Sequence, residues 1–146
     1  MRTEFHTMLL SKLKDVGEPR FNLAHEKLFN IIIDADEILG AAATGERQLT
    51  EEEWNALSSA SDDLAAYTKV HFAEEEAFLV ARSYPESDRH RATHLGLVEE
   101  LNNFQKKVAQ RDEQDLKEMR RWLLEWLLSH INHEDYAYAQ HFFGKQ

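Results

Sequence analysis

Apolar residues recur along the chain at intervals that alternate between three and four positions, in four long stretches separated by short polar breaks. This spacing is typical of amphipathic helices that bury one face. The first stretch begins at Pro19 and continues to about Gly45, which suits a helix C-terminus. The stripe that we expect to be buried comprises Phe21, His25, Leu28, Ile32, Ala35 and Leu39.

The second stretch begins at Thr50, where Glu53 three positions later completes a capping box, and it stops before Pro85. Its buried seam is predicted to hold Trp54, Leu57, Ser61, Leu64, Thr68, His71, Glu75 and Phe78. The third stretch starts near Ser87 and presents His90, His94, Leu97, Leu101, Phe104 and Val108. The fourth follows a polar break at about residues 110–113 and presents Leu116, Met119, Leu123, Trp126 and His130.

Four long helices joined by short connections favour antiparallel neighbours. The sequence therefore predicts an all-α fold, an up-down-up-down antiparallel four-helix bundle formed by residues 19–146. Residues 1–18 carry a separate apolar pattern, and we expect them to form a short N-terminal helix or arm against the bundle. The residues of that pattern are Met8, Leu9, Leu10, Leu13 and Val16.

Composition excludes several classes of function. The chain has no Cys, so disulfides, iron–sulfur clusters and thiol catalysis are ruled out. It has 17 basic and 27 acidic residues, a net charge of -10, without the clustered basic residues that nucleic-acid binding requires. Charged residues interrupt the first 17 positions, so neither a signal peptide nor a membrane span is predicted there, and we expect a cytoplasmic protein. No particular protein partner is indicated.

The chain holds eight His, and five of them occupy seam positions that would otherwise be apolar. One buried His is usually a hydrogen-bonded core residue, but five on four helices all need partners in an apolar core. A shared metal centre provides those partners. His71 and Glu75 are four positions apart, as are His90 and His94, so each pair projects from one helix face. Nitrogen and oxygen ligands suit iron, manganese or zinc, and their number favours two metal ions.

These residues resemble the bacterial hemerythrins over about residues 20–143. The resemblance rests on the runs His25-Glu26-Lys27-Leu28-Phe29, His71-Phe72-Ala73-Glu74-Glu75-Glu76, Tyr84-Pro85 with His90-Arg91-Ala92-Thr93-His94, and Trp126-Leu127-Leu128-Ser129-His130-Ile131 with Asp135. It implies two iron ions joined by an oxo or hydroxo bridge. One iron would take His90, His94 and His130, the other His25 and His71, and Glu75 and Asp135 would bridge them. Three residues match the positions that line the oxygen pocket in the family: Trp126, Leu127 and Ile131.

The function that this resemblance implies is reversible binding of dioxygen, as a carrier, store or sensor. The alternatives are a di-iron oxidase, a peroxidase, an enzyme that handles nitric oxide, or a module that senses iron or redox state. All seven matching positions are metal ligands rather than acid–base residues, which favours binding over catalysis. Dioxygen is therefore the expected partner.

The spacing at the end of the fourth helix conflicts with a regular α-helix. His130 and Asp135 are five positions apart, about 140° around the helix axis, so they would not share a face. Periodicity alone would choose His133 or Glu134. The next apolar residue, Tyr138, is also shifted by one position from the upstream seam. We therefore predict a local π-type widening of the helix between His130 and Asp135.

The start of the chain departs from the family pattern. Asn22 stands where the family usually has Asp three residues before the first ligand His, and we expect it to form local hydrogen bonds. The remaining His residues, His6, His133 and His141, match no ligand of the family. They are expected to be solvated or hydrogen-bonded.

Overall fold

Helices account for all the regular secondary structure in the part of the chain that the structure, a computed structural model, describes: residues 4–43, 47–111, 113–114 and 116–144. In chain order they are α1 (Glu4–Ser11), α2 (Pro19–Ala43), α3 (Glu51–Ala81), α4 (Ser87–Ala109), α5 (Leu116–His130), the π-helical segment η1 (Ile131–Asp135) and α6 (Tyr136–Phe143). The predicted cap at Gly45 lies outside the described residues.

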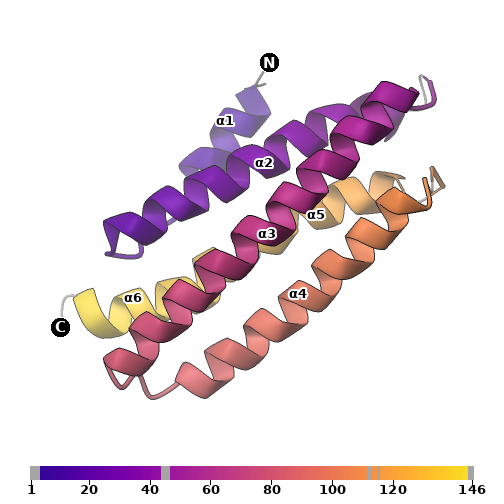
Figure 1. Ribbon diagram of the computed structural model, residues 1–146. Coiled ribbons are helices and arrows are strands. Elements are labelled where there is room, and N and C mark those ends of the chain that lie inside the picture. The colour runs from indigo at the N-terminus through magenta and orange to yellow at the C-terminus, as the bar shows by residue number, and fades with distance from the viewer. Residues whose placement is uncertain (1–3, 44–46, 112, 115, 145–146) are drawn as a thin grey trace.

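The four long helical stretches run alternately up and down, as Figure 1 shows, with α6 continuing the line of α5. Close backbone contacts join α2 with α3, α3 with α4, and α2 with α5. The indole Nε1–H of Trp126 on α5 donates to the Leu97 carbonyl on α4 at 3.2 Å and so links the remaining pair. The predicted antiparallel four-helix bundle is therefore confirmed.

The start of α3 follows directly from its sequence. The Thr50 hydroxyl accepts a hydrogen bond from the Glu53 N–H at 3.1 Å, and the Glu53 carboxylate accepts one from the Thr50 N–H at 3.0 Å. Two donors that the first helical turn leaves without partners are thereby satisfied. This capping box fixes where α3 begins and therefore where His71 and Glu75 lie along it.

The predicted stripes form the core between the helices. Residues such as Leu28, Ile32, Leu57 and Leu123 are completely buried. Leu97 is only half-buried, and the side chain of Leu116 lies outside the described residues. Burial of one such side chain contributes about 1.5–3 kcal/mol, so the stripes supply most of the stabilisation.

The end of the fourth helix is widened as predicted. The backbone from Ile131 to Asp135 is π-helical and places one additional residue in the turn. Beyond it Tyr138 is completely buried, whereas Ala137 and His141 are exposed. The buried stripe therefore shifts by one position at the turn, which is the shift that the apolar pattern indicated.

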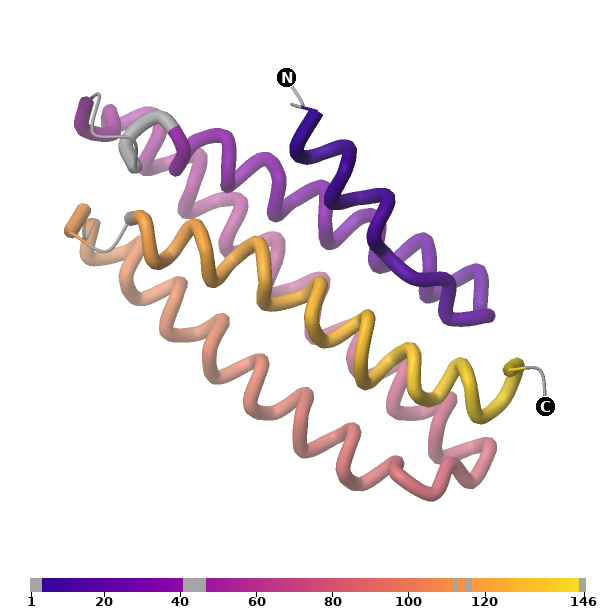
Figure 2. The backbone as a smooth tube through the Cα atoms, turned by 180° about the vertical axis from the view of Figure 1, so that it is seen from behind, coloured from indigo at the N-terminus to yellow at the C-terminus, as the bar shows by residue number. Residues whose placement is uncertain are grey.

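The short N-terminal helix α1 lies outside the bundle, beside α2 (Figure 2). Leu9 and Val16 are buried, whereas Met8 is 45% exposed. The His6 imidazole is also buried, with its Nε2 2.6 Å from the completely buried Asp36 carboxylate of α2. The Arg120 guanidinium of α5 donates to the other Asp36 oxygen at 2.6 Å. A buried polar contact therefore connects α1 to the bundle.

Among the described residues, no helix combines the length and the apolar character that crossing a membrane requires.

Candidate metal centre

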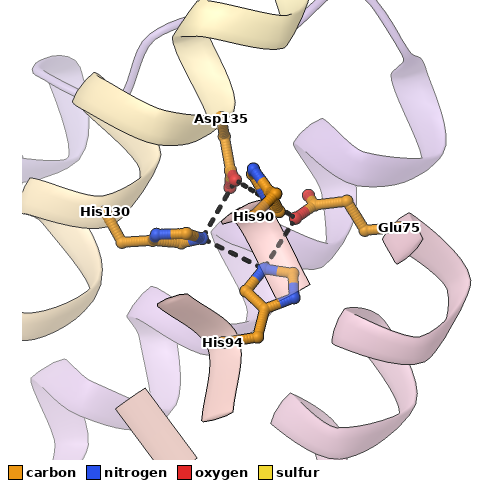
Figure 3. A group of neighbouring side chains, drawn as sticks. All are labelled: Glu75, His90, His94, His130 and Asp135. Carbon is orange, nitrogen blue, oxygen red and sulfur yellow. Dashed lines mark hydrogen bonds and ion pairs between the residues drawn. The ribbon is translucent and has the colours of Figure 1, made fainter. Parts of the chain in front are cut away.

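The seven residues predicted as metal ligands converge inside the bundle, and none is more than 4% exposed. They form two groups that share Glu75 and Asp135. Figure 3 shows the larger group, whose side chains come from α3, α4, α5 and η1. The larger group comprises Glu75, His90, His94, His130 and Asp135, and the smaller comprises His25, His71, Glu75 and Asp135.

Local helix geometry places these side chains. His71 and Glu75 lie one turn apart on α3, and α4 places His90 and His94 in the same way. The π turn brings Asp135 to the same interior face as His130, which a regular α-helix would not do.

Donor atoms of the larger group are spaced as the ligands of one metal ion are. Glu75 Oε1 lies 2.9 Å from His90 Nε2 and 3.0 Å from His94 Nε2. Asp135 Oδ1 lies 3.0 Å from the Nε2 atoms of both His90 and His130. Two ligands at right angles and about 2.1 Å from one ion are separated by roughly 3 Å. This group therefore already has the spacing of a coordination shell (Figure 3).

The second oxygen of each carboxylate faces the smaller group. Glu75 Oε2 lies 3.4 Å from His71 Nε2 and 3.8 Å from His25 Nε2. Asp135 Oδ2 lies 3.2 Å from His25 Nε2. Each carboxylate therefore directs one oxygen to each group, which is the arrangement of a ligand that bridges two metal ions.

The two buried carboxylates make this interior strongly electronegative. Burial alone raises the pKa of Glu75, but four neighbouring imidazoles hold that pKa well below its usual value. For His25 and His90, burial acts in the opposite direction and lowers the pKa. Hydrogen bonds and charge from Asp135 and Glu75 outweigh this effect of burial and raise both pKa values to about 9. The same effect, led by Asp135, raises the pKa of His130 to about 10. The site therefore stabilises positive charge.

Tyr138 is a site residue that the sequence indicated only as core. Its hydroxyl donates to Glu75 Oε2 at 3.0 Å, and its side chain is completely buried. Burial, with the negative charges of Glu75 and Asp135, raises the pKa of this phenol, so it stays protonated as a donor. The shifted apolar pattern after the π turn was the signal that placed it inward.

His94 also has partners that the sequence pattern did not reveal. Its Nδ1 lies 2.9 Å from Glu76 Oε2, whereas Glu76 was expected to be a solvated neighbour of Glu75. Glu74 is exposed, as expected. The ring of Phe72 stacks on the His94 imidazole with centroids 3.8 Å apart and planes 3° apart. The contacts with Glu76 and Phe72 fix the orientation of the His94 ring, in which its Nε2 faces the centre.

The remaining predicted residues lie as follows. Trp126, Leu127 and Ile131 are all buried in the apolar core. His133 is hydrogen-bonded through Nδ1 to the Ser129 carbonyl at 2.7 Å. His141 is exposed, with its ring packed against Tyr84, and His6 pairs with Asp36 as described above.

Comparison with known proteins identifies the family. The model of the hemerythrin HHE cation-binding domain matches residues 18–142, a range that includes all seven candidate ligands. The chain belongs to the hemerythrin family. Like hemerythrins generally, it is a candidate for binding non-haem iron.

The relatives include bacteriohemerythrins and a hemerythrin subunit. A bacteriohemerythrin of Clostridium acetobutylicum is 23% identical over 85% of this chain and 92% of its own length. A bacteriohemerythrin of Stenotrophomonas maltophilia is 31% identical over 58% of this chain and 54% of its own. Hemerythrin subunit alpha of Lingula anatina is 31% identical over 53% of this chain and 62% of its own.

Proposed function

We propose that this hemerythrin-like protein is a non-haem di-iron protein that binds dioxygen reversibly. The observation that carries the proposal is the pair of buried ligand groups that share Glu75 and Asp135, each carboxylate with one oxygen toward each group. His90, His94 and His130 would hold one iron. His25 and His71 would hold the other, and both carboxylates would bridge the two.

The residues present fit such a centre. Several buried nitrogen and oxygen atoms of the candidate ligands have no hydrogen-bond partner, which costs free energy in an apolar interior. Cations bound by the Nε2 atoms of His25 and His71 and by the two oxygens of Asp135 would remove that cost for these four atoms. Nitrogen and oxygen donors without sulfur suit iron. The atoms concerned are both ring nitrogens of His25 and His71, Nδ1 of His130 and both carboxylate oxygens of Asp135.

The two groups differ in the number of residues that they supply. The larger has five residues and the smaller four, with Glu75 and Asp135 counted in both. The iron held by His25 and His71 would therefore have fewer protein ligands and room for a small molecule. When bound, the two irons would supply the electrons for reversible binding of dioxygen.

Residues around the ligands would protect such a bound molecule. The Tyr138 hydroxyl holds a proton against Glu75 and keeps that carboxylate in one orientation. Trp126, Leu127 and Ile131 would line the oxygen pocket, where their apolar side chains exclude water. This arrangement favours storage or carriage of dioxygen over its consumption.

The test is to count metals and then to reduce the protein without air, admit dioxygen and record the visible spectrum. We expect two irons per chain and an absorption band that appears with dioxygen and disappears when it is removed. Rapid irreversible oxidation or continuous consumption of hydrogen peroxide would instead indicate an enzyme. Less than one iron per chain after reconstitution, or zinc alone, would refute the proposal.

A predicted consequence concerns Leu127, which is 1% exposed. Leu127→Ala should accelerate irreversible oxidation of the oxygen-bound protein about tenfold, because the smaller side chain admits water to the apolar wall. The decay of the visible band in air measures this rate.

The control is Leu57→Ala, which removes an equally buried side chain. Leu57 lies 14 residues before His71 on α3, about 21 Å along the helix axis. This variant should lose stability without a faster decay. Equal acceleration in both variants would show that the effect comes from general loosening of the bundle.

A further inference from the structure

The connection between α1 and α2 is tied to the π turn by one side chain. The Asn132 amide Nδ2 donates to the Lys12 carbonyl at 2.9 Å, and its Oδ1 accepts a hydrogen bond from the Lys14 N–H at 3.1 Å. Both polar groups of one amide therefore bind backbone groups two residues apart. Asn132 belongs to η1, three positions before Asp135.

A residue on the other side of Asp135 in sequence also contacts this connection. The Lys14 ammonium lies over the ring of Tyr136, 4.2 Å from its centroid, as a cation–π pair. Positions 132 and 136 flank Asp135 in sequence and both contact one short piece of chain.

The connection is itself fixed to the bundle. The Val16 N–H donates to Asn22 Oδ1 at 3.0 Å, and Asn22 Nδ2 donates to Asp15 Oδ1 at 2.8 Å. The Val16 side chain is completely buried. Gly17 has φ +83°, and a Cβ there would lie 2.2 Å from the Phe143 ring. Residues 12–17 are therefore a support with attachments to α2 and α6.

The π turn needs such a support, because π-helical turns are uncommon and compete with the regular α-helix. Reversion to an α-helix would rotate every later residue by about 100°. Asp135 would then leave the interior, and Tyr136 would move relative to Asn132. That rotation would carry the Tyr136 ring away from the Lys14 ammonium while Asn132 stays beside the connection, so the two contacts together favour the π-helical register.

From this geometry we infer that Asn132 is a positioning residue: it holds the π turn against the N-terminal connection and so keeps Asp135 directed into the centre. This inference rests on the proposed role of Asp135 as a metal ligand. Asn132 acts through the backbone of the turn. Its contacts with Lys12 and Lys14 give the N-terminal arm a function. The arm supports the metal centre from outside the bundle.

The test is Asn132→Ala in the full chain. In the metal-free protein, amide hydrogen exchange across residues 131–136 should become roughly tenfold faster, because two hydrogen bonds that hold the turn are lost. The affinity for the second metal ion, titrated without air, should fall about tenfold. Lys14→Met should accelerate exchange of the same amides about twofold, because it removes only the cation over Tyr136.

Val108→Ala is the matched control. Val108 is 3% exposed and lies 18 residues after His90 on α4, about 27 Å along the helix axis. This variant should lower global stability and leave both readouts at the turn unchanged. Unchanged exchange in Asn132→Ala, or equal acceleration in Val108→Ala, would overturn the inference. If the unmodified protein takes up fewer than two metals, the proposed function fails, and the exchange comparison still decides whether Asn132 holds the turn.

Discussion

Replacement of Glu75 by Ala is expected to abolish the binding of two metal ions per chain. Glu75 is completely buried, and its two oxygens face His90 and His94 on one side and His71 on the other. Its loss therefore removes a ligand from both groups and leaves the imidazoles around a single carboxylate. Because loss of an outer partner of a ligand already weakens binding 10–100-fold, loss of this shared ligand should exceed roughly 100-fold. Iron counting after anaerobic titration and desalting measures the result.

Two further variants make this prediction specific. His71→Ala removes a ligand from the smaller group alone, so this variant should retain one iron, bound by the larger group. His141→Ala changes an exposed His on α6 and should retain two irons. Full loading of Glu75→Ala, or the same deficit in His141→Ala, would contradict the assignment of the centre.

The architecture could be predicted because it depends on local periodicity. Burial of one face at intervals of three and four residues dictates where helices lie, and Thr50 with Glu53 marks the start of α3. The interior positions of His71, His90 and Glu75 follow from the same pattern. Each was visible because a polar residue occupied a place in an apolar stripe.

The π turn was predictable only from two sources combined. Periodicity alone would have chosen His133 or Glu134 to face the centre, and the family resemblance indicated Asp135 instead. The conflict between them predicted a widened turn, and the structure places it at Ile131–Asp135. A single helical period contains no information about where a turn departs from it.

Contacts between helices could not be predicted in this way. Glu74 and Glu76 have similar sequence surroundings, yet only Glu76 lies on the side of α3 that packs against His94 of α4. The same holds for Asn132, whose partners lie 118 and 120 positions away in sequence. Such pairings depend on how helices are aligned against one another, which one helix cannot specify.

Removal of the metals is expected to lower the thermal midpoint of unfolding by roughly 15–30 °C. A ligand at 1,000 times its Kd stabilises the native state by about 4 kcal/mol, so two metal ions contribute about 8 kcal/mol. In a chain of this size each kcal/mol corresponds to roughly 2–4 °C. This gain includes the relief of buried atoms of His25, His71 and Asp135 that form no hydrogen bond in the metal-free centre. Differential scanning calorimetry of iron-loaded and chelator-treated protein measures the difference.

The Glu75→Ala variant separates this effect from chelator damage. Because that variant cannot hold two metals, chelator treatment should move its midpoint by only a few degrees. Anaerobic Fe²⁺ should restore the midpoint of the treated protein, whereas Ca²⁺ should not, since imidazole-rich sites disfavour that cation. If the loaded and metal-free proteins unfold within about 5 °C of each other, the two groups do not bind metal tightly. The buried carboxylates would then be balanced by protonated imidazoles alone, consistent with the pKa of His130 near 10.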